Sequence, residues 1–194
     1  MKKIYKREQY LKKIRGFYDE DEIIKVITGV RRCGKSTLLE IVKEELKERG
    51  IPERNIISIH LDKRPYKSVK KADELESVID AKSRDSEGII YLFIDEIQNV
   101  TGFEEVINAF REEGNFSIFI TGSNSYLLSG ELATKLTGRY IEFEMTTLSF
   151  DEYLGMKKFY GKDMKPQIED EFDQYILEGG FPYAVRLSSA GDKR

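Results

Sequence analysis

The chain has 194 residues, of which 40% are hydrophobic and 35% are charged. At about 150 residues per domain, this length suits one well-buried core with an appendage. The 32 Lys and Arg residues nearly cancel the 35 Asp and Glu residues, so a net charge of −3 excludes a global electrostatic pull toward nucleic acid or an anionic membrane.

Three short apolar runs lie near residues 23–28, 89–94 and 116–120. Each is far shorter than the roughly 18 residues of a transmembrane helix, and the lysine-rich start lacks the apolar stretch of a secretory signal. Cys33 is the only cysteine, so no internal disulfide can form. These features predict a cytoplasmic protein with no membrane partner.

The first segment, residues 1–22, predicts an amphipathic helix that packs on the core. Its apolar side chains recur at helical spacing, and an acidic run at residues 19–22 separates it from the first strand. The apolar positions are Tyr10, Leu11, Ile14 and Phe17.

Residues 23–145 predict a core in which strands and helices alternate. Predicted strands cover residues 23–28, 55–61, 89–94, 116–120 and 140–143, and predicted helices cover residues 35–49, the region of 75–79 and residues 103–112. Gly50 and Pro52 are the stop signals of the first core helix. This alternation is typical of an α/β fold with a parallel sheet and helices on both faces.

The connection between the first core strand and helix matches the phosphate-binding pattern G-x-x-x-x-G-K-[ST]. Its glycines allow a tight turn whose backbone N–H groups, together with the start of the next helix, favour a polyphosphate. The residues that match are Gly29, Val30, Arg31, Arg32, Cys33, Gly34, Lys35 and Ser36.

Three side chains of this loop have expected roles. Lys35 would contact the β- and γ-phosphates, Ser36 would bind Mg²⁺, and Thr37 would help to hold the α- or β-phosphate. The alternative is a glycine-rich turn that binds nothing. Cys33 is expected to be a small loop residue, with an oxidisable thiol as the alternative.

Asp95 and Glu96 follow the strongly apolar run at residues 89–94. Ligands bind at the carboxyl ends of parallel strands, so Asp95 is a candidate Mg²⁺ ligand and Glu96 a candidate general base for the attacking water. An ordinary strand end is the alternative interpretation.

Ser123 and Asn124 follow the next strand. Either side chain suits a hydrogen bond to the γ-phosphate, and the Asn124 amide is suited to hold the water, because an amide both donates and accepts. A turn with a helix N-cap is the alternative, and both roles are compatible.

Arg139 precedes the fifth strand. A guanidinium stabilises charge on a transferred phosphoryl group, so Arg139 is a candidate for acting on a neighbouring subunit's nucleotide, with a surface ion pair as the alternative. His60 is the only histidine and is expected to be structural. The basic segment 62–71 is expected to be a solvated loop, with nucleic-acid binding as its alternative.

These motifs resemble the AAA+ branch of P-loop ATPases over roughly residues 5–185, with GVRRCGKST as Walker A, IIYLFIDE as Walker B and FITGSNS as the sensor-1 strand. The resemblance implies a three-layer P-loop NTPase fold with a parallel five-stranded sheet of order 5-1-4-3-2. It also implies ATP and Mg²⁺ as ligands, Asn124 as sensor 1 and Arg139 as an arginine finger.

More narrowly, the chain is similar to a prokaryotic ATPase family that joins this core to a C-terminal domain of unknown function. The segments LSFDEYL and EGGFPYAV carry this likeness, and residues 146–194 are expected to be a helical extension that starts a truncated C-terminal region. A homo-oligomer and an unknown protein or DNA partner are the expected assemblies.

The leading functional hypothesis is Mg-dependent ATP hydrolysis coupled to a partner or a conformational output. A nucleotide-dependent binding switch with little turnover is the second hypothesis. A phosphotransferase that acts on a small molecule is the third, and two features disfavour it: the Asp95–Glu96 pair and the absence of an evident acceptor pocket.

Overall fold

The computed structural model describes residues 3–123, 135, 136 and 138–187. Its five strands form one parallel sheet in the order β2-β3-β4-β1-β5. This is the predicted 5-1-4-3-2 order, so the predicted α/β fold is confirmed. The strands are β1 (Ile24–Gly29), β2 (Ile56–His60), β3 (Ile90–Asp95), β4 (Phe116–Thr121) and β5 (Tyr140–Met145).

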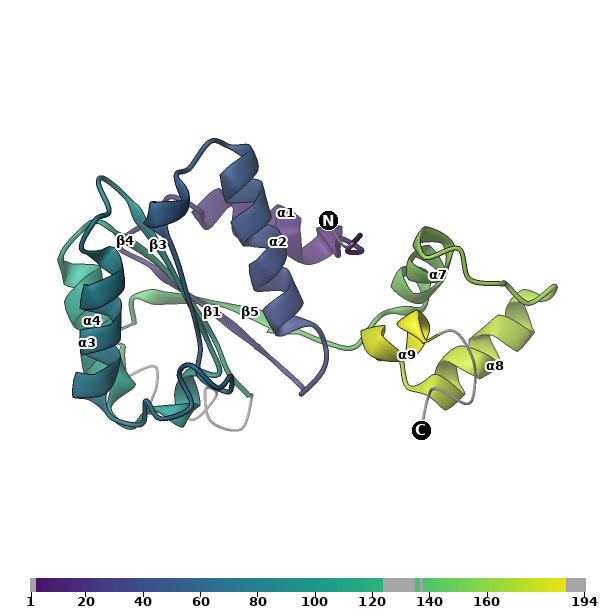
Figure 1. Ribbon diagram of the computed structural model, residues 1–194. Helices are drawn as coiled ribbons and strands as arrows, with labels where there is room; N and C mark the ends of the chain where they lie inside the picture. Colours follow the sequence, from purple (N-terminus) through teal and green to yellow (C-terminus); the bar gives the residue numbers. More distant parts are fainter. Residues whose placement is uncertain (1–2, 124–134, 137, 188–194) are drawn as a thin grey trace.

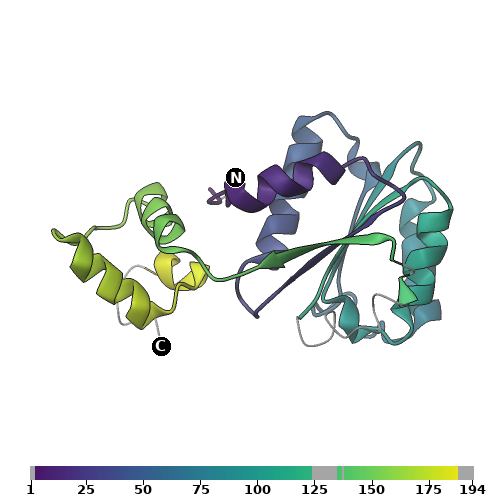
Figure 2. The same cartoon turned by 180° about the vertical axis from the view of Figure 1, so that it is seen from behind.

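Helices cover both faces of the sheet (Figure 1). One face packs against α1 (Glu8–Ile14) and α2 (Lys35–Glu48), and the opposite face packs against α3 (Ala72–Ser83) and α4 (Phe103–Glu112). Figure 2 shows the same arrangement from behind. Three short 3₁₀ turns also lie in the described part of the core, namely η1 (Arg15–Phe17), η2 (Glu53–Asn55) and η3 (Ile97–Asn99).

Strand β3 shows why the sequence forms this layered core. Ile90, Leu92 and Ile94 pack toward α3 and α4, whereas Tyr91 and Phe93 pack toward α1 and α2. Successive side chains of a strand point to opposite faces, so a strand covered on both sides needs an uninterrupted apolar run. Each such buried side chain contributes about 2 kcal/mol to folding.

Strand β5 runs two residues beyond the predicted end at residue 143. It lies at the edge of the sheet, where Glu142 and Glu144 are exposed and Phe143 and Met145 are buried. This alternation is typical of a strand with one covered face. The two glutamates interrupt the apolar run, so the sequence predicts a strand that ends too early.

Beyond β5 the described residues form three further helices, α7 (Phe150–Phe159), α8 (Ile168–Glu178) and α9 (Pro182–Arg186), which we call the C-terminal unit. Leu148, Tyr153, Met156 and Val185 form a separate small core there. The unit lies next to the loop that joins β1 to α2 (Figure 1), where the Pro182 ring approaches Gly34. Among the helices of the described residues, none combines the length and apolarity needed to cross a bilayer.

Candidate functional site

The loop between β1 and α2 has the backbone of a tight cradle. Gly29 has a φ of 141°, and a Cβ at this position would lie 2.2 Å from the Met145 carbonyl oxygen of β5. Gly34 has a φ of 112° and is the N-cap of α2. Both positions therefore require glycine, which explains their spacing in the motif. Gly34 is the N-cap and has no side chain, so it leaves the first backbone amides of α2 without a side-chain cap.

Lys35 folds back over this loop. Its side chain is nearly buried, with 6% of the residue exposed, and Nζ donates to the carbonyl oxygens of Gly29 at 2.9 Å and Val30 at 3.3 Å. The ammonium group is thus held at the centre of the loop. Cys33 is fully buried beside Gly29, and burial raises the pKa of its thiol, which favours the role of a small loop residue.

Asp95 ends β3 and is only 3% exposed. Thr121 Oγ1 donates to Asp95 Oδ1 at 2.5 Å, and His60 Nδ1 lies 3.3 Å from Oδ2. Burial alone raises the pKa of the Asp95 carboxyl, but hydrogen bonds from His60, Thr121 and Ser36 outweigh it and hold the pKa below its ordinary value. The site therefore presents an ionised carboxylate beside the Ser36 hydroxyl.

Glu96 follows at a sharp turn and has a φ of 61°, in the left-handed region that few non-glycine residues adopt. Its backbone N–H donates to Thr121 Oγ1 at 3.1 Å, and its carboxylate accepts a bond of 2.5 Å from the Gln98 side-chain amide. Thr121 thus fixes the direction in which the chain leaves β3, and Gln98 holds the carboxylate of Glu96.

His60 lies in this site, although the sequence predicts a structural role for it. The register of β2 and β3 pairs His60 with Asp95, and Nε2 lies 3.4 Å from Glu40 Oε1 of α2. The hydrogen bond to Asp95, together with Glu40, raises the pKa of His60 to about 8, and His60 in turn lowers the pKa of Glu40 to about 2. A lone histidine at a strand end carries no local signal for this contact.

The remaining predicted residues differ in how the structure places them. Ser123 follows β4 and is partly buried, whereas Asn124 lies outside the described residues. Arg139 is exposed and precedes β5, and its carbonyl accepts from the Ile24 N–H at the start of β1. Arg139 therefore lies at the opposite end of the sheet from the phosphate loop, far from Lys35 and Asp95 of the same chain.

A cleft of about 820 Å³ lies beside the β1–α2 loop, the start of α2 and the end of β3. Lys35, Ser36, Asp95 and Glu96 line one wall. The opposite walls come from the N-terminal segment and the C-terminal unit, through Ile4, Tyr5, Arg7, Met156, Tyr160, Pro182, Tyr183 and Arg186. This volume is in the range of ligand sites. The sequence places none of these eight residues in the site, because only the packing of the two terminal segments brings them there.

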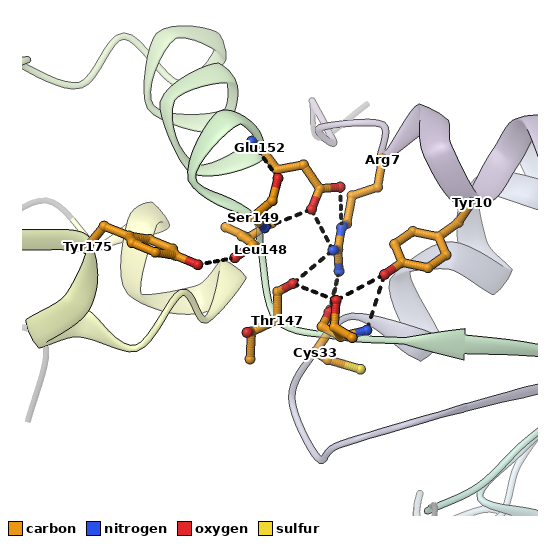
Figure 3. A network of polar contacts seen from close by, with 9 residues as sticks. Arg7, Tyr10, Cys33, Thr147, Leu148, Ser149, Glu152 and Tyr175 are labelled. Atoms are coloured by element: carbon orange, nitrogen blue, oxygen red, sulfur yellow. Dashed lines mark hydrogen bonds and ion pairs between the residues drawn. The ribbon is translucent and has the colours of Figure 1, made fainter. Parts of the chain in front are cut away.

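Arg7 connects the walls of the cleft (Figure 3). Its guanidinium forms a two-bond ion pair with Glu152 of α7, at 2.8 and 2.6 Å, and donates to the Cys33 carbonyl of the phosphate loop at 3.1 Å. It also lies over the Tyr10 ring, 4.7 Å from the ring centre. The terminal segments are thereby tied to the phosphate loop.

The donor set fits a magnesium ion of the kind that nucleotides carry. In the part of the chain that the structure describes, no group of three or more His, Cys, Asp and Glu side chains is arranged to hold a metal. Mg²⁺ with a nucleotide needs only one or two protein ligands, because phosphate and water oxygens complete its octahedron. The adjacent Ser36 hydroxyl and Asp95 carboxylate meet this requirement.

Residues 21–154 match a protein family described as "AAA domain". Two curated relatives extend the similarity over most of the chain. An uncharacterized protein of Haemophilus influenzae is 43% identical over 185 residues, covering 95% of this chain and 45% of the relative. An uncharacterized protein of Methanocaldococcus jannaschii is 35% identical over 181 residues, covering 88% of this chain and 38% of the relative. The chain thus spans less than half the length of these relatives.

Solved structures share the fold at low sequence identity. Caenorhabditis elegans PCH-2 has a TM-score of 0.56 at 16% identity, covering 81% of this chain and 47% of that one. A Thermotoga maritima protein related to the DNA polymerase III gamma subunit has a TM-score of 0.55 at 13% identity, covering 91% and 56%. Saccharomyces cerevisiae Rif2 has a TM-score of 0.53 at 17% identity, covering 91% and 70%.

Proposed function

Because this chain belongs to the AAA domain family, an AAA+ branch of P-loop ATPases, we propose that it binds Mg-ATP in the cleft and hydrolyses it. One observation carries the proposal: Lys35, Ser36 and Asp95 converge on a single cleft from a loop, a helix and a strand. A turn that binds nothing has no need of a buried lysine and a buried ionised aspartate at the same edge of a sheet.

In the proposed complex the loop amides from Gly29 to Thr37 hold the phosphates, and Lys35 exchanges its carbonyl partners for β- and γ-phosphate oxygens. Ser36 and Asp95 would hold Mg²⁺, which would supply positive charge to neutralise the phosphates. Arg32 lines the same cleft and adds positive potential. These groups position and neutralise the phosphates, which is most of what phosphoryl transfer requires.

Hydrolysis needs a base for the water. We assign this role to Glu96, which lines the cleft beside Asp95. The water oxygen forms a bond to the γ-phosphorus, the bond from that phosphorus to the bridging oxygen breaks, and the proton of the water passes to the Glu96 carboxylate. Ser123 and Asn124 remain proposed partners of the γ-phosphate and the water.

Replacement of the base tests this assignment. Glu96→Gln keeps the size of the side chain and its contact with Gln98 but removes the proton acceptor. We expect Mg-ATP to bind with parental affinity in calorimetry while phosphate release falls by about 10²-fold or more. Glu105→Gln, the same change at an exposed position of α4, should leave both unchanged. Equal phosphate release by parent and Glu96→Gln would remove Glu96 from this role.

A nucleotide-dependent switch with little turnover is a second candidate. The observation that favours it is the 2.5 Å bond from Gln98, which engages one oxygen of the Glu96 carboxylate. A switch would bind Mg-ATP and release at most one phosphate per chain, whereas an ATPase turns over repeatedly. Quenched-flow measurement of phosphate against protein concentration separates the two.

The biological response to the nucleotide state depends on the whole protein and not on this region alone. The curated relatives are more than twice as long as the region they share with this chain, and we propose that a protein or DNA partner responds to the nucleotide state. We also propose three functional parts for the chain: residues 1–22 as a helix packed on the core, residues 23–145 as the ATPase core and residues 146–194 as a helical extension.

A further inference from the structure

Arg7 lies outside every nucleotide-binding motif of the sequence, yet it is one of the most constrained side chains in the structure. The residue is only 5% exposed, although an arginine is rarely buried without several partners. It precedes α1, lines the nucleotide cleft and reaches three separate parts of the chain. This combination calls for a role beyond packing.

The guanidinium of Arg7 donates hydrogen bonds both to the C-terminal unit and to the core (Figure 3). Toward the C-terminal unit, Nε and Nη2 donate to the two carboxylate oxygens of Glu152, and Nη2 also donates to the Thr147 carbonyl at 3.1 Å. Toward the core, Nη1 donates to the Cys33 carbonyl at 3.1 Å. The same nitrogen donates to the Thr146 carbonyl at 2.8 Å, in the segment that leads to α7. A lysine could not make this set of bonds, because the planar guanidinium presents its donors in a fixed fork.

The partners on the side of the C-terminal unit are themselves held firmly. Glu152 accepts from the Ser149 N–H at 3.0 Å and donates its own N–H to Ser149 Oγ at 3.2 Å, which caps α7. The Leu148 N–H donates to the Gly180 carbonyl, and the Tyr175 hydroxyl donates to the Leu148 carbonyl. A shift of the segment 146–149 relative to Arg7 therefore moves the C-terminal helices with it.

The partner on the core side belongs to the phosphate loop. Cys33 immediately precedes Gly34 and Lys35, and the Cys33 N–H donates to the Val30 carbonyl, the same carbonyl that accepts from Lys35 Nζ. In the proposed complex Lys35 turns to a phosphate, so we expect the Val30 carbonyl to lose that bond and the loop that carries the Cys33 carbonyl to adjust. Arg7 is thus in direct contact with the part of the loop in which we expect this change.

We infer that Arg7 is a positioning residue that couples nucleotide binding in the phosphate loop to the seating of the C-terminal unit, through Glu152. The inference rests on the proposed nucleotide site. Bound nucleotide and the Arg7–Glu152 contact then favour the same conformation of the chain. Because such coupling is reciprocal, loss of the Arg7–Glu152 contact should also change the affinity for nucleotide.

Hydrogen exchange of backbone amides, measured on the chain with and without Mg-ADP, tests the coupling. In the parent, Mg-ADP should slow exchange both in the loop at residues 29–36 and in the segment 146–152, the latter by about fivefold or more. In Glu152→Gln, Mg-ADP should slow exchange in the loop alone. Arg7→Lys, which keeps the charge but not the planar fork of donors, should behave as Glu152→Gln does. It provides the result if Glu152→Gln folds poorly.

Glu45→Gln is the matched control. Glu45 also accepts two bonds from an arginine, Arg15, but it lies on α2 away from the loop. This variant should keep the parental response at residues 146–152. A purely structural role for Arg7 would lower stability with and without Mg-ADP alike and leave the ligand-dependent change intact.

Each other outcome has a distinct meaning. If Mg-ADP protects residues 146–152 equally in the parent and in Glu152→Gln, the inference is wrong and the nucleotide site stands. The same holds if the parent is protected in the loop but not at residues 146–152. If calorimetry finds no binding of Mg-ADP or Mg-ATP to the parent, the proposed function fails and the inference fails with it.

Discussion

At the scale of single residues, the site is organised around one buried carboxylate. Asp95 receives hydrogen bonds from His60 of β2, Thr121 of β4 and Ser36 of α2. An ionised group at 3% exposure is tolerated only with such partners, because burial without them costs several kcal/mol. These neighbours fix the direction of the carboxylate before any ligand binds, and we expect this to lower the cost of binding Mg²⁺.

Another buried ionisable side chain lies at the opposite end of the sheet. Lys25 of β1 is fully buried, and its Nζ donates to the Glu20 carbonyl at 2.5 Å and to Ser117 Oγ at 2.9 Å. The ammonium also lies 4.6 Å from the centre of the Phe119 ring. Burial lowers the pKa of Lys25 from 10.5 to about 7, against the attraction of nearby acidic side chains.

This shift predicts a rise in stability with pH. Between about pH 7 and 10 the unfolded chain keeps the Lys25 proton that the folded chain has released, so the free energy of unfolding increases as pH rises. Lys25→Met should remove this component. We expect the difference in free energy of unfolding between Lys25→Met and the parent to change between pH 7 and 9.5, measured by urea denaturation.

The exposed residue Lys12 supplies the control for this experiment. Lys12→Met should give a stability curve that runs parallel to the parent across the same pH range. A parallel curve for Lys25→Met as well would mean that Lys25 keeps its proton in the folded state.

At the scale of elements, parallel pairing decides which residues meet. The carboxyl ends of β1, β3 and β4 share one edge of the sheet, where the phosphate loop, Asp95 and Thr121 come together.

In the C-terminal unit, a buried ion pair joins α7 and α8. Lys157 Nζ lies 2.6 and 2.9 Å from the two carboxylate oxygens of Glu171, which is 1% exposed.

Breaking this ion pair on one side should be costly. Lys157→Met leaves the Glu171 carboxylate buried with only the Lys165 N–H as a partner among the contacts described, and we expect a loss of about 3–5 kcal/mol from the stability of the C-terminal unit. The double variant Lys157→Met with Glu171→Leu should recover much of this loss, because it removes both charges. Amide exchange in α8 measures the effect, and equal exchange in the single variant and the parent would contradict it.

At the scale of the whole molecule, the cleft is closed by segments from both ends of the described chain. The N-terminal segment and the C-terminal unit lie side by side next to the phosphate loop (Figures 1 and 2), and Tyr5 packs closely against Gly155 of α7. Arg139, at the far end of the sheet, cannot complete this cleft within one chain. If it acts in hydrolysis, it does so between subunits.

Mixing of inactive variants tests that arrangement. Lys35→Ala should lose nucleotide binding but keep Arg139, whereas Arg139→Ala should bind nucleotide but fail to hydrolyse it. We expect each alone to release little phosphate and the mixture to recover part of the parental rate. Specific activity of the parent should also rise with protein concentration. Arg84→Ala, an exposed arginine after α3, serves as the control and should stay active. If mixing recovers no activity and the specific activity does not change with protein concentration, Arg139 has no role in hydrolysis and a surface ion pair is the remaining interpretation.

The sequence by itself determined two features of this protein: the strands and helices of the core, and the strand ends that carry polar residues. Apolar runs and helical spacing are local signals, and so are a glycine pair with a lysine and an Asp-Glu pair after a buried strand. The sheet order followed from the family resemblance and is confirmed. The roles of Lys35, Ser36, Asp95 and Glu96 stay predictions.

Only the tertiary structure decided what surrounds those residues. His60 and Thr121 reach Asp95 through strand pairing, and Arg7 reaches Cys33 and Glu152 through the packing of both terminal segments. Contacts between residues 26 to 145 positions apart leave no period or spacing in a single sequence, because they depend on how finished elements pack and not on how each one forms.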